Sequence, residues 1–239
     1  MEAGTRSSSL NELPPAPPGK TGWPWTGDSS LLPGATPAAS TLTGSGLNLE
    51  AGDLAWPRVS IITPSYNQGQ FLEATIRSVL LQGYPNLEYF VIDGGSTDGS
   101  VDIIRKYERW LAYWVSENDR GQSHAINKGF AAAHGDILTW LNSDDFLLPR
   151  AIAHVVELHR AEPTAAAWVG ACHRIDSDRR ILSTAVPRGL DRDSLADWGN
   201  RGWFYQPSCF FAAQAWREAG TLDETSHYAF DLDLWLRLA

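Results

Sequence analysis

Two adjacent carboxylates, Asp144 and Asp145, follow directly after a short apolar stretch, and this pattern is the clearest indication of chemistry in the sequence. The stretch ends at Leu141 and is typical of a buried strand, so both acids are expected where that strand ends. Neighbouring carboxylates repel each other and resist desolvation unless a positive charge lies beside them. A divalent cation is the usual partner. The alternative is that both acids only cap the helix expected after Pro149.

Polar or acidic residues also follow three earlier stretches that are expected to be strands, over residues 59–63, 87–92 and 112–115. Apolar residues at helical spacing lie between these stretches. Strands and helices that alternate in this way predict a parallel sheet with right-handed connections. A single Asp after a strand usually belongs to a turn. Four polar clusters at one edge instead predict a ligand site, because ligands of open α/β sheets bind beyond the carboxyl ends of the strands.

Composition limits the class of protein. The chain has 239 residues, 43% of them hydrophobic, which is enough for a substantial core. Its net charge of −9 argues against a nucleic-acid partner. The two cysteines, Cys172 and Cys209, suggest neither a disulfide framework nor a zinc site. Without a membrane-spanning run or a signal peptide, the protein is expected to be cytoplasmic, at most peripheral to the inner face of the membrane.

The first part of the chain differs from the rest. Residues 1–55 are rich in Pro, Gly and Ser and are expected to form a flexible leader. Trp23 and Trp25 could dock on the folded domain, although isolated tryptophans in such a segment more often do nothing specific. Residues 56–239 are expected to form the folded domain.

The last third of the chain no longer alternates strand and helix. After a helix around residues 151–159, the stretches 166–171 and 181–184 are expected to pair as a hairpin. An aromatic, partly strand-like stretch covers residues 202–211. The apolar helix over residues 230–238 has no polar tail, which suggests that the native chain continues.

Taken in order, seven motifs resemble those of family 2 glycosyltransferases with the GT-A fold. They occupy residues 59–67, 91–100, 116–122, 127–129, 142–145, 206–208 and 231–235. The resemblance implies an α/β fold with a mostly parallel central sheet flanked by helices. It implies a donor half over residues 56–148 and an acceptor half over residues 149–239.

Members of this family move a sugar, typically a hexose, from a nucleotide-diphospho-sugar donor to an acceptor hydroxyl with inversion. Glycan or lipid-linked acceptors follow from the resemblance, in cell-surface glycan, polysaccharide or glycolipid biosynthesis such as that of the cell wall.

The resemblance implies that the nucleotide-sugar donor binds residues at the strand ends. These residues are Thr63, Pro64, Tyr66, Asn67, Asp93, Asp119 and Asn142. Tyr66 and the backbone around it are expected against the base and ribose, although ordinary packing is the alternative for this ring. Asp93 is expected to accept a hydrogen bond from a ring N–H of the base. Asp119 is expected to close the side of the pocket. Gly94 and Gly95 lack the spacing of a dinucleotide fingerprint, which argues against a dehydrogenase.

The family's Asp-x-Asp pattern is only partly met, because Asn142 occupies its first position. The resemblance makes Asp144 the leading metal ligand, with Asp145 in support. Mg²⁺ or Mn²⁺ fits, since both prefer oxygen ligands and bridge phosphates. With one negative charge fewer, metal affinity is expected to be weaker than usual.

The catalytic base is expected at the start of the last helix, where the family has a Glu-Asp pair and this chain has Phe230 and Asp231. Asp231 is therefore the expected base and Asp233 the alternative. Either acid could instead be a first-turn residue favoured by the helix dipole. His227 lies nearby and could help to hold the acceptor.

Two other functions stay open from the sequence. A catalytically silent sugar-nucleotide or glycan-binding protein is one, because Asn142 and Phe230 replace family acids. A nucleotidyltransferase is the other, but that class needs a glycine-rich loop with a basic residue directly after the first strand. The segment from Pro64 to Asn67 has neither.

Overall fold

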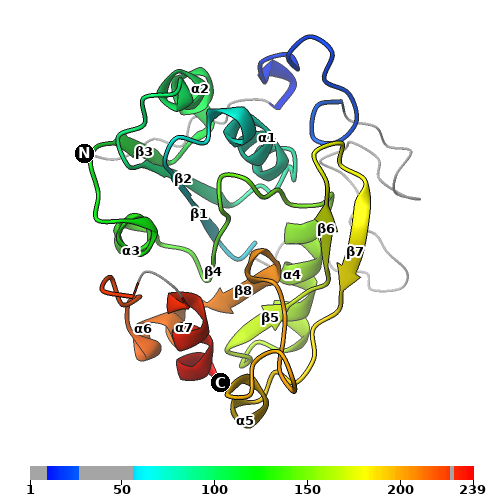
Figure 1. The fold of residues 1–239 in the computed structure, drawn as a ribbon, viewed down its shortest axis with the longest axis vertical. Coiled ribbons are helices and arrows are strands. Elements are labelled where there is room, and N and C mark those ends of the chain that lie inside the picture. The colour runs from blue at the N-terminus through cyan, green and yellow to red at the C-terminus, as the bar shows by residue number, and fades with distance from the viewer. Residues whose placement is uncertain (1–9, 27–55, 227–228) are drawn as a thin grey trace.

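A six-stranded sheet runs through the part of the protein that the computed structural model describes, residues 10–26, 56–226 and 229–239 (Figure 1). In sheet order, its strands are β3 (Tyr113–Ser116), β2 (Leu87–Asp93), β1 (Val59–Ser65), β4 (Ile137–Trp140), β8 (Cys209–Ala212) and β5 (Ala167–Val169). The first four are mutually parallel, β8 is antiparallel to β4, and β5 is antiparallel to β8. The prediction of a mostly parallel sheet is confirmed.

Helices cover both faces of this sheet. One face packs against α1 (Gly69–Leu80), α2 (Ser100–Tyr107) and α4 (Ala151–Ala161). The other packs against α3 (Gln122–Ala132), α5 (Arg192–Leu195), α6 (Ala213–Ala219) and α7 (Phe230–Leu238). Short 3₁₀ turns occur at Leu10–Glu12, Glu108–Trp110 and Gln206–Ser208. No described helix is both long and apolar enough to cross a membrane.

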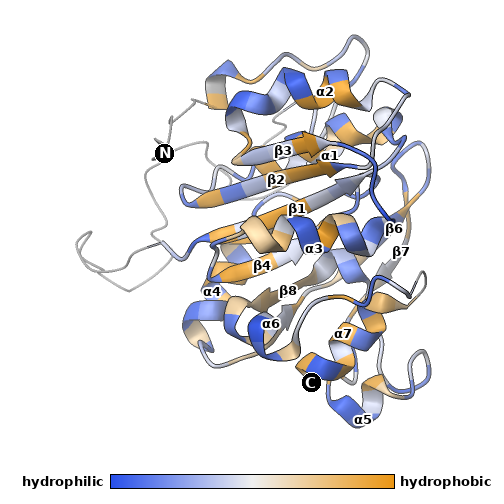
Figure 2. Ribbon diagram, turned by 90° about the vertical axis from the view of Figure 1, so that its left-hand side faces the viewer, coloured by the Kyte–Doolittle hydropathy of each residue, from blue (hydrophilic) through white to orange (hydrophobic). Residues whose placement is uncertain are grey.

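Alternation along the strands produces these two layers. Ile61 belongs to the core on the α1 side, whereas its neighbour Ile62 belongs to the core on the α3 side. Val91 and Ile92 divide in the same way, as expected when successive side chains point to opposite faces. Figure 2 shows the hydrophobic strands between helices whose outer surfaces are more hydrophilic.

An aromatic cluster holds α7 against the sheet. Trp140, the last residue of β4, stacks on Trp235 with ring centroids 5.4 Å apart and an interplanar angle of 4°. Phe230 lies 6.3 Å from the Trp140 ring, and Phe211 lies 6.2 Å from it. The start of α7 is therefore positioned relative to the carboxyl end of β4.

β1 is longer than expected. Its pairing with β2 continues through Pro64 to Ser65, opposite Ile92 and Asp93, whereas the strand was predicted to cover only residues 59–63. Leu141 N donates to Ile62 O, so the backbone polar groups of Ile62 face β4. The backbone nitrogen of Pro64, two residues later, faces the same side but lies beyond the last β1–β4 pair. A missing N–H there removes no ladder hydrogen bond, which is why proline is tolerated.

The hairpin prediction was wrong in one arm. Residues 167–169 join the main sheet as β5, opposite β8. The hairpin consists of β6 (Cys172–Ile175) and β7 (Ile181–Ala185). Trp168, 5% exposed, accounts for the difference, because its ring is buried between the edge of the sheet and α4.

Residues 10–26 differ from the flexible leader that was expected there, since they lie along α1 (Figure 1). Trp25 and Arg77 of α1 are each only 6% exposed. The Arg77 guanidinium donates to Pro14 O at 2.6 Å, Pro24 O at 3.0 Å and Trp25 O at 3.2 Å. A buried cation needs such acceptors, and the segment provides them. Residues 1–9 and 27–55 lie outside the described residues.

We predict that Trp235→Ala destabilises the protein strongly. Trp235 is 3% exposed and stacks on Trp140, so truncation leaves a cavity in the aromatic cluster. The expected loss is about 3–5 kcal/mol in the free energy of unfolding, measured by urea denaturation. Leu182→Ala, at a side chain 61% exposed, is the control and is expected to change it by less than about 0.5 kcal/mol. Equal effects of the two changes would contradict the role given to the stack.

Candidate active site

The acids beyond β4 lie on a loop that α1 holds in place. The Thr75 hydroxyl contacts two backbone carbonyls of this loop, Ser143 O at 2.9 Å and Asp145 O at 2.7 Å. Asp145 N donates to Asn142 O at 3.0 Å and closes a turn. Asp144 is exposed and Asp145 is partly buried. The two neighbouring acids therefore differ in their exposure to solvent.

Asp145 shows the electrostatic cost of this arrangement. Burial, and then the charge of Asp144, raise the pKa of Asp145 to about 7. A hydrogen bond from the Asn142 side chain opposes the rise. A cation beside the pair would relieve both the burial cost and the repulsion, so the two acids suit a divalent ion.

The donor set is small. No cluster of three or more His, Cys, Asp or Glu side chains suited to a metal ion occurs in residues 10–26, 56–226 and 229–239. Mg²⁺ in phosphate-transferring sites is typically held by one or two carboxylates and completed by substrate phosphates and water. Asp144 and Asp145 fit that kind of site and do not form a complete protein cage.

Asn142 has a structural explanation as well. Its Oδ1 accepts from Gln122 Nε2 at 2.6 Å, which ties the start of α3 to the end of β4. Its side chain also donates toward Asp145. An aspartate at this position would place a third negative charge beside the pair and lose the donor. Asparagine is therefore compatible with the two acids that follow it.

Asp93 lies beneath the surface, not on it. The residue is 0% exposed. Its Oδ2 accepts from Gly95 N at 3.1 Å, Ser96 N at 2.9 Å and Ser116 Oγ at 2.6 Å. Its Oδ1 accepts from Ser96 Oγ at 2.5 Å. In this conformation the carboxylate organises the loop after β2, and it has no exposed surface to offer a nucleotide base.

The residues expected around the base and ribose divide into two groups. Thr63 and Pro64 are buried within β1, and the Thr63 hydroxyl bonds the Tyr89 hydroxyl at 3.0 Å. Tyr66 is 63% exposed, which contradicts ordinary packing for its ring. Asn67, at φ 53°, accepts from Thr97 N at 2.9 Å and so joins the loop after β1 to the loop after β2.

Asp119 lies against the glycines after β2. A Cβ on Gly94 would be 2.7 Å from Asp119 Oδ2, and a Cβ on Gly95 would be 2.6 Å from Asn118 Oδ1. Only residues without a side chain allow the loops after β2 and β3 to approach this closely. Asp119 also accepts from Gly121 N at 2.8 Å, which orients the turn into α3.

Three residues at the start of α7, of which Asp231 and Asp233 are the candidate bases, have different surroundings. Phe230 is 8% exposed and belongs to the aromatic cluster. Asp233 pairs with Arg237, whose Nη2 lies 2.9 Å from its Oδ2. Asp231 is partly exposed and forms no ion pair within the described residues, where its Oδ1 accepts a hydrogen bond from Leu232 N at 2.8 Å. Asp231 is thus the more available acid. His227 lies outside the described residues.

Asn127 of α3 anchors the chain that leads toward α7. Its Oδ1 accepts from Leu222 N at 2.9 Å, while its Nδ2 donates to Leu222 O at 2.9 Å and to Glu224 Oε1 at 3.1 Å. Arg120 forms an ion pair with the same Glu224. Hydrogen bonds from Asn127 and Arg120 lower the pKa of Glu224. Residues 222–224, which precede Asp231, are therefore held to α3 and to the loop before it.

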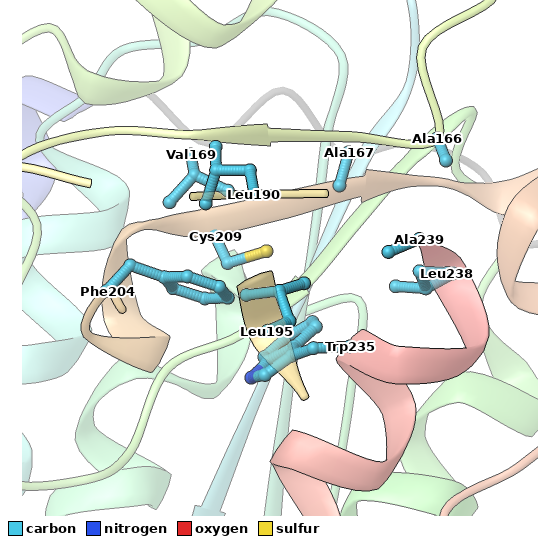
Figure 3. A pocket seen from close by; sticks show the side chains of 10 residues that line it. All are labelled: Ala166, Ala167, Val169, Leu190, Leu195, Phe204, Cys209, Trp235, Leu238 and Ala239. Atoms are coloured by element: carbon cyan, nitrogen blue, oxygen red, sulfur yellow. The ribbon is translucent and has the colours of Figure 1, made fainter. Parts of the chain in front are cut away.

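A cavity of about 210 Å³ lies between the β5–β8 edge, α5 and α7 (Figure 3). Its lining consists of Ala166, Ala167, Val169, Leu190, Leu195, Phe204, Cys209, Trp235, Leu238 and Ala239. None of these side chains is charged, so the cavity does not suit a diphosphate. The acids lie elsewhere, at the carboxyl ends of the parallel strands.

These contacts thus join the expected site residues in three separate groups. Asn142 and Asp145 interact directly, the loops carrying Asn67 and Asp93 are joined, and α7 with Asp231 packs on the end of β4 through Trp235. Sequence motifs contained three further residues that were not assigned a site role. These are Gln122, Asn127 and Gln206, whose Nε2 donates to Trp140 O at 2.8 Å. The signal that could have identified these three residues was a polar side chain at a motif position near the end of a strand.

Comparisons with solved structures agree with this architecture. A mannosyltransferase from Pyrobaculum calidifontis, solved in complex with GDP-Man and Mn²⁺, is 25% identical with a TM-score of 0.54. The match covers 71% of this chain and 48% of that one. Residues 1–349 of S. aureus TarS match with 17% identity and a TM-score of 0.60, covering 76% and 55% of the two chains. The chain therefore spans about half the length of these two solved proteins.

Sequence comparisons identify relatives. An uncharacterized glycosyltransferase from Mycobacterium tuberculosis is 43% identical over 186 residues, which cover 77% of this chain and 69% of the relative. A Bacillus subtilis protein with the provisional name teichuronic acid biosynthesis glycosyltransferase is 42% identical over 93 residues, 37% of this chain and 36% of that one. The sequence profile of Glycosyl transferase family 2 matches residues 60–227. The chain belongs to glycosyl transferase family 2.

Proposed function

We propose that this protein is an inverting, metal-dependent glycosyltransferase that moves a sugar from a nucleotide-diphospho-sugar to an acceptor hydroxyl. The observation that carries the proposal is the pair Asp144 and Asp145 beyond β4, one exposed and one with a pKa raised to about 7 by burial and by its neighbour. Such a pair needs positive charge, and a donor diphosphate needs the same cation. The family membership supports the reaction class.

The donor would lie across the loops at the carboxyl ends of the parallel strands. Tyr66 offers an exposed ring for the base or ribose, and Asn67 fixes the loop that carries it. Asp119 would close the side of the pocket, and Asn142 would form its floor. We propose that Asp93 acts on the nucleotide through the loop that it organises. Thr63 and Pro64 would contribute backbone position only.

Asp144 would be the direct metal ligand, with Asp145 beside it. Mg²⁺ or Mn²⁺ bound there would neutralise charge on the departing diphosphate. The mannosyltransferase solved with GDP-Man and Mn²⁺ supports the use of a divalent cation. Asn142 and Gln122 would hold the loop so that both carboxylates keep their positions before the donor binds.

Asp231 would act as the base. As the acceptor oxygen attacks the anomeric carbon, its proton would pass to the Asp231 carboxylate. The carbon–oxygen bond to the diphosphate breaks on the opposite face, which gives inversion. Attachment of α7 to the end of β4 through Trp235 and Trp140 supports this role, because it places the first turn of α7 relative to the metal loop.

The acceptor is proposed to be a glycan or a lipid-linked saccharide of the cell surface. The Bacillus subtilis relative, whose provisional name refers to teichuronic acid biosynthesis, supports this class. We propose that the protein works in the cytoplasm, or at the inner face of the membrane if the acceptor is lipid-linked.

We predict that Asp144→Asn abolishes sugar transfer. A panel of nucleotide sugars, including GDP-mannose, is incubated with wild type and variant in Mn²⁺ or in EDTA, and release of the nucleoside diphosphate is measured. Wild type is expected to depend on Mn²⁺, and the variant to lose at least about 100-fold in rate. The control is Asp178→Asn, at an exposed carboxylate paired only with Arg180 in the described chain. Full activity of Asp144→Asn would contradict the proposal.

We predict that Mn²⁺ binds about tenfold more tightly at pH 8 than at pH 6. With a pKa of about 7, Asp145 keeps its proton at pH 6 and must lose it to bind the ion. Without metal, ionisation of this buried acid lowers stability as the pH rises from about 4 toward 7.

Both effects are measured by thermal shift against pH and Mn²⁺ concentration. Asp145→Asn is expected to remove the pH dependence and weaken binding at pH 8. Identical affinity of wild type at both pH values would count against this role for Asp145.

We predict that Asp231→Asn lowers kcat by about 10²- to 10⁴-fold while leaving donor affinity unchanged. The amide keeps the size of the side chain and removes its basicity. Asp233→Asn is the comparison, because it breaks only the ion pair with Arg237 and is expected to cost less than about tenfold. A larger loss from Asp233→Asn than from Asp231→Asn would reverse the assignment.

A further inference from the structure

The segment of residues 10–26 reaches the loop that carries the metal ligands. Trp23 Nε1 donates to Leu147 O at 2.8 Å, two residues after Asp145. Leu147 is 5% exposed, so its carbonyl lies in a region poorly supplied with water. A hydrogen bond in such a place counts for more than one at the surface, because the acceptor has no substitute when the donor is removed.

The opposite side of the same loop is held by α1. Leu147 N donates to Ser78 Oγ at 3.1 Å, and the Thr75 hydroxyl binds the carbonyls of Ser143 and Asp145. Residues 143–147 are therefore held from two directions, by α1 and by Trp23. Only one of those directions comes from the part of the chain that the family profile matches, residues 60–227.

Arg179, in the turn between β6 and β7, joins the segment to the hairpin. Its Nη1 donates to Trp23 O at 2.7 Å. Its guanidinium lies 5.4 Å from the Trp25 ring centroid and 5.5 Å from that of Phe146, which directly follows Asp145. Burial lowers the pKa of Arg179. Figure 1 shows the segment between α1 and the tip of the hairpin.

We propose that residues 10–26 form a strap that positions the metal loop, with Trp23 and Arg179 as positioning residues for Asp144 and Asp145. The strap is anchored on α1 through Arg77 and reaches the loop through the Trp23 indole. It keeps Leu147 and Phe146 in place, and hence the backbone of the acids just before them. The inference rests on the proposed metal site and adds to it a segment outside the family profile.

The test compares two like substitutions in the full chain. Trp23→Phe keeps a ring and removes the N–H that binds Leu147 O. Trp25→Phe makes the same change at an indole N–H that has no hydrogen-bond partner within the described residues. Mn²⁺ affinity is measured by electron paramagnetic resonance of the free ion, and hydrogen exchange is followed at residues 143–148.

Trp23→Phe is expected to weaken Mn²⁺ binding about fivefold, as the loss of one buried hydrogen bond predicts, and to speed exchange in the loop. Trp25→Phe is expected to lower the melting temperature without either effect. Arg179→Gln is expected to follow Trp23→Phe. A merely structural role would change the melting temperature alone, so the Mn²⁺ affinity separates the two roles.

The strap proposal would be overturned if Trp23→Phe kept the wild-type Mn²⁺ affinity and the wild-type exchange rates. Equal losses of Mn²⁺ affinity in Trp23→Phe and Trp25→Phe would also overturn it. If wild type binds no Mn²⁺, the proposed metal site fails, and the exchange data still decide whether the strap holds the loop. Faster exchange confined to Trp23→Phe and Arg179→Gln would support it. Unchanged exchange would reject it.

Discussion

Repulsion between Asp144 and Asp145 is the constraint that the surrounding structure must withstand. Adjacent carboxylates at a strand end, one of them desolvated, raise the free energy of the folded state unless a positive charge joins them. A fold that keeps such a pair must hold its backbone firmly, because the loop would otherwise relax and separate the charges. The contacts from Thr75, Ser78 and Trp23 provide that hold.

β4 connects the loop that carries the two acids to the rest of the molecule. Its last residue, Trp140, stacks on Trp235 and accepts a hydrogen bond from Gln206. Both partners come from the later half of the chain, whereas Gln122 reaches the same strand end from α3. The earlier and later parts of the chain are thus joined at one strand end, which gives the aromatic packing of the core a role in positioning polar groups.

Much of the parallel part of the sheet could be predicted from the sequence. The runs that form β1, β2 and β4 are short, apolar and followed by helical spacing, and these local signals do not depend on distant parts of the chain. For the same reason Asp144 and Asp145 could be placed at a strand end. The family motifs supplied the reaction class, which spacing alone would not have done.

Other features depend on partners that are distant in sequence. The burial of Asp93 requires Ser116, 23 residues away. The packing of residues 10–26 depends on Arg77, whose acceptors in that segment are backbone carbonyls, which any residue type can supply. The position of β5 depends on β8, about 40 residues later, and pairing at that distance is not a local signal.

The most direct test of the central claim is anomalous diffraction at the manganese edge, from crystals grown with Mn²⁺ and a nucleoside diphosphate. We expect one strong peak bonded to the Asp144 carboxylate and in contact with the diphosphate. A diphosphate bound at the strand ends with no manganese beside Asp144, or manganese bound at another place, would contradict it.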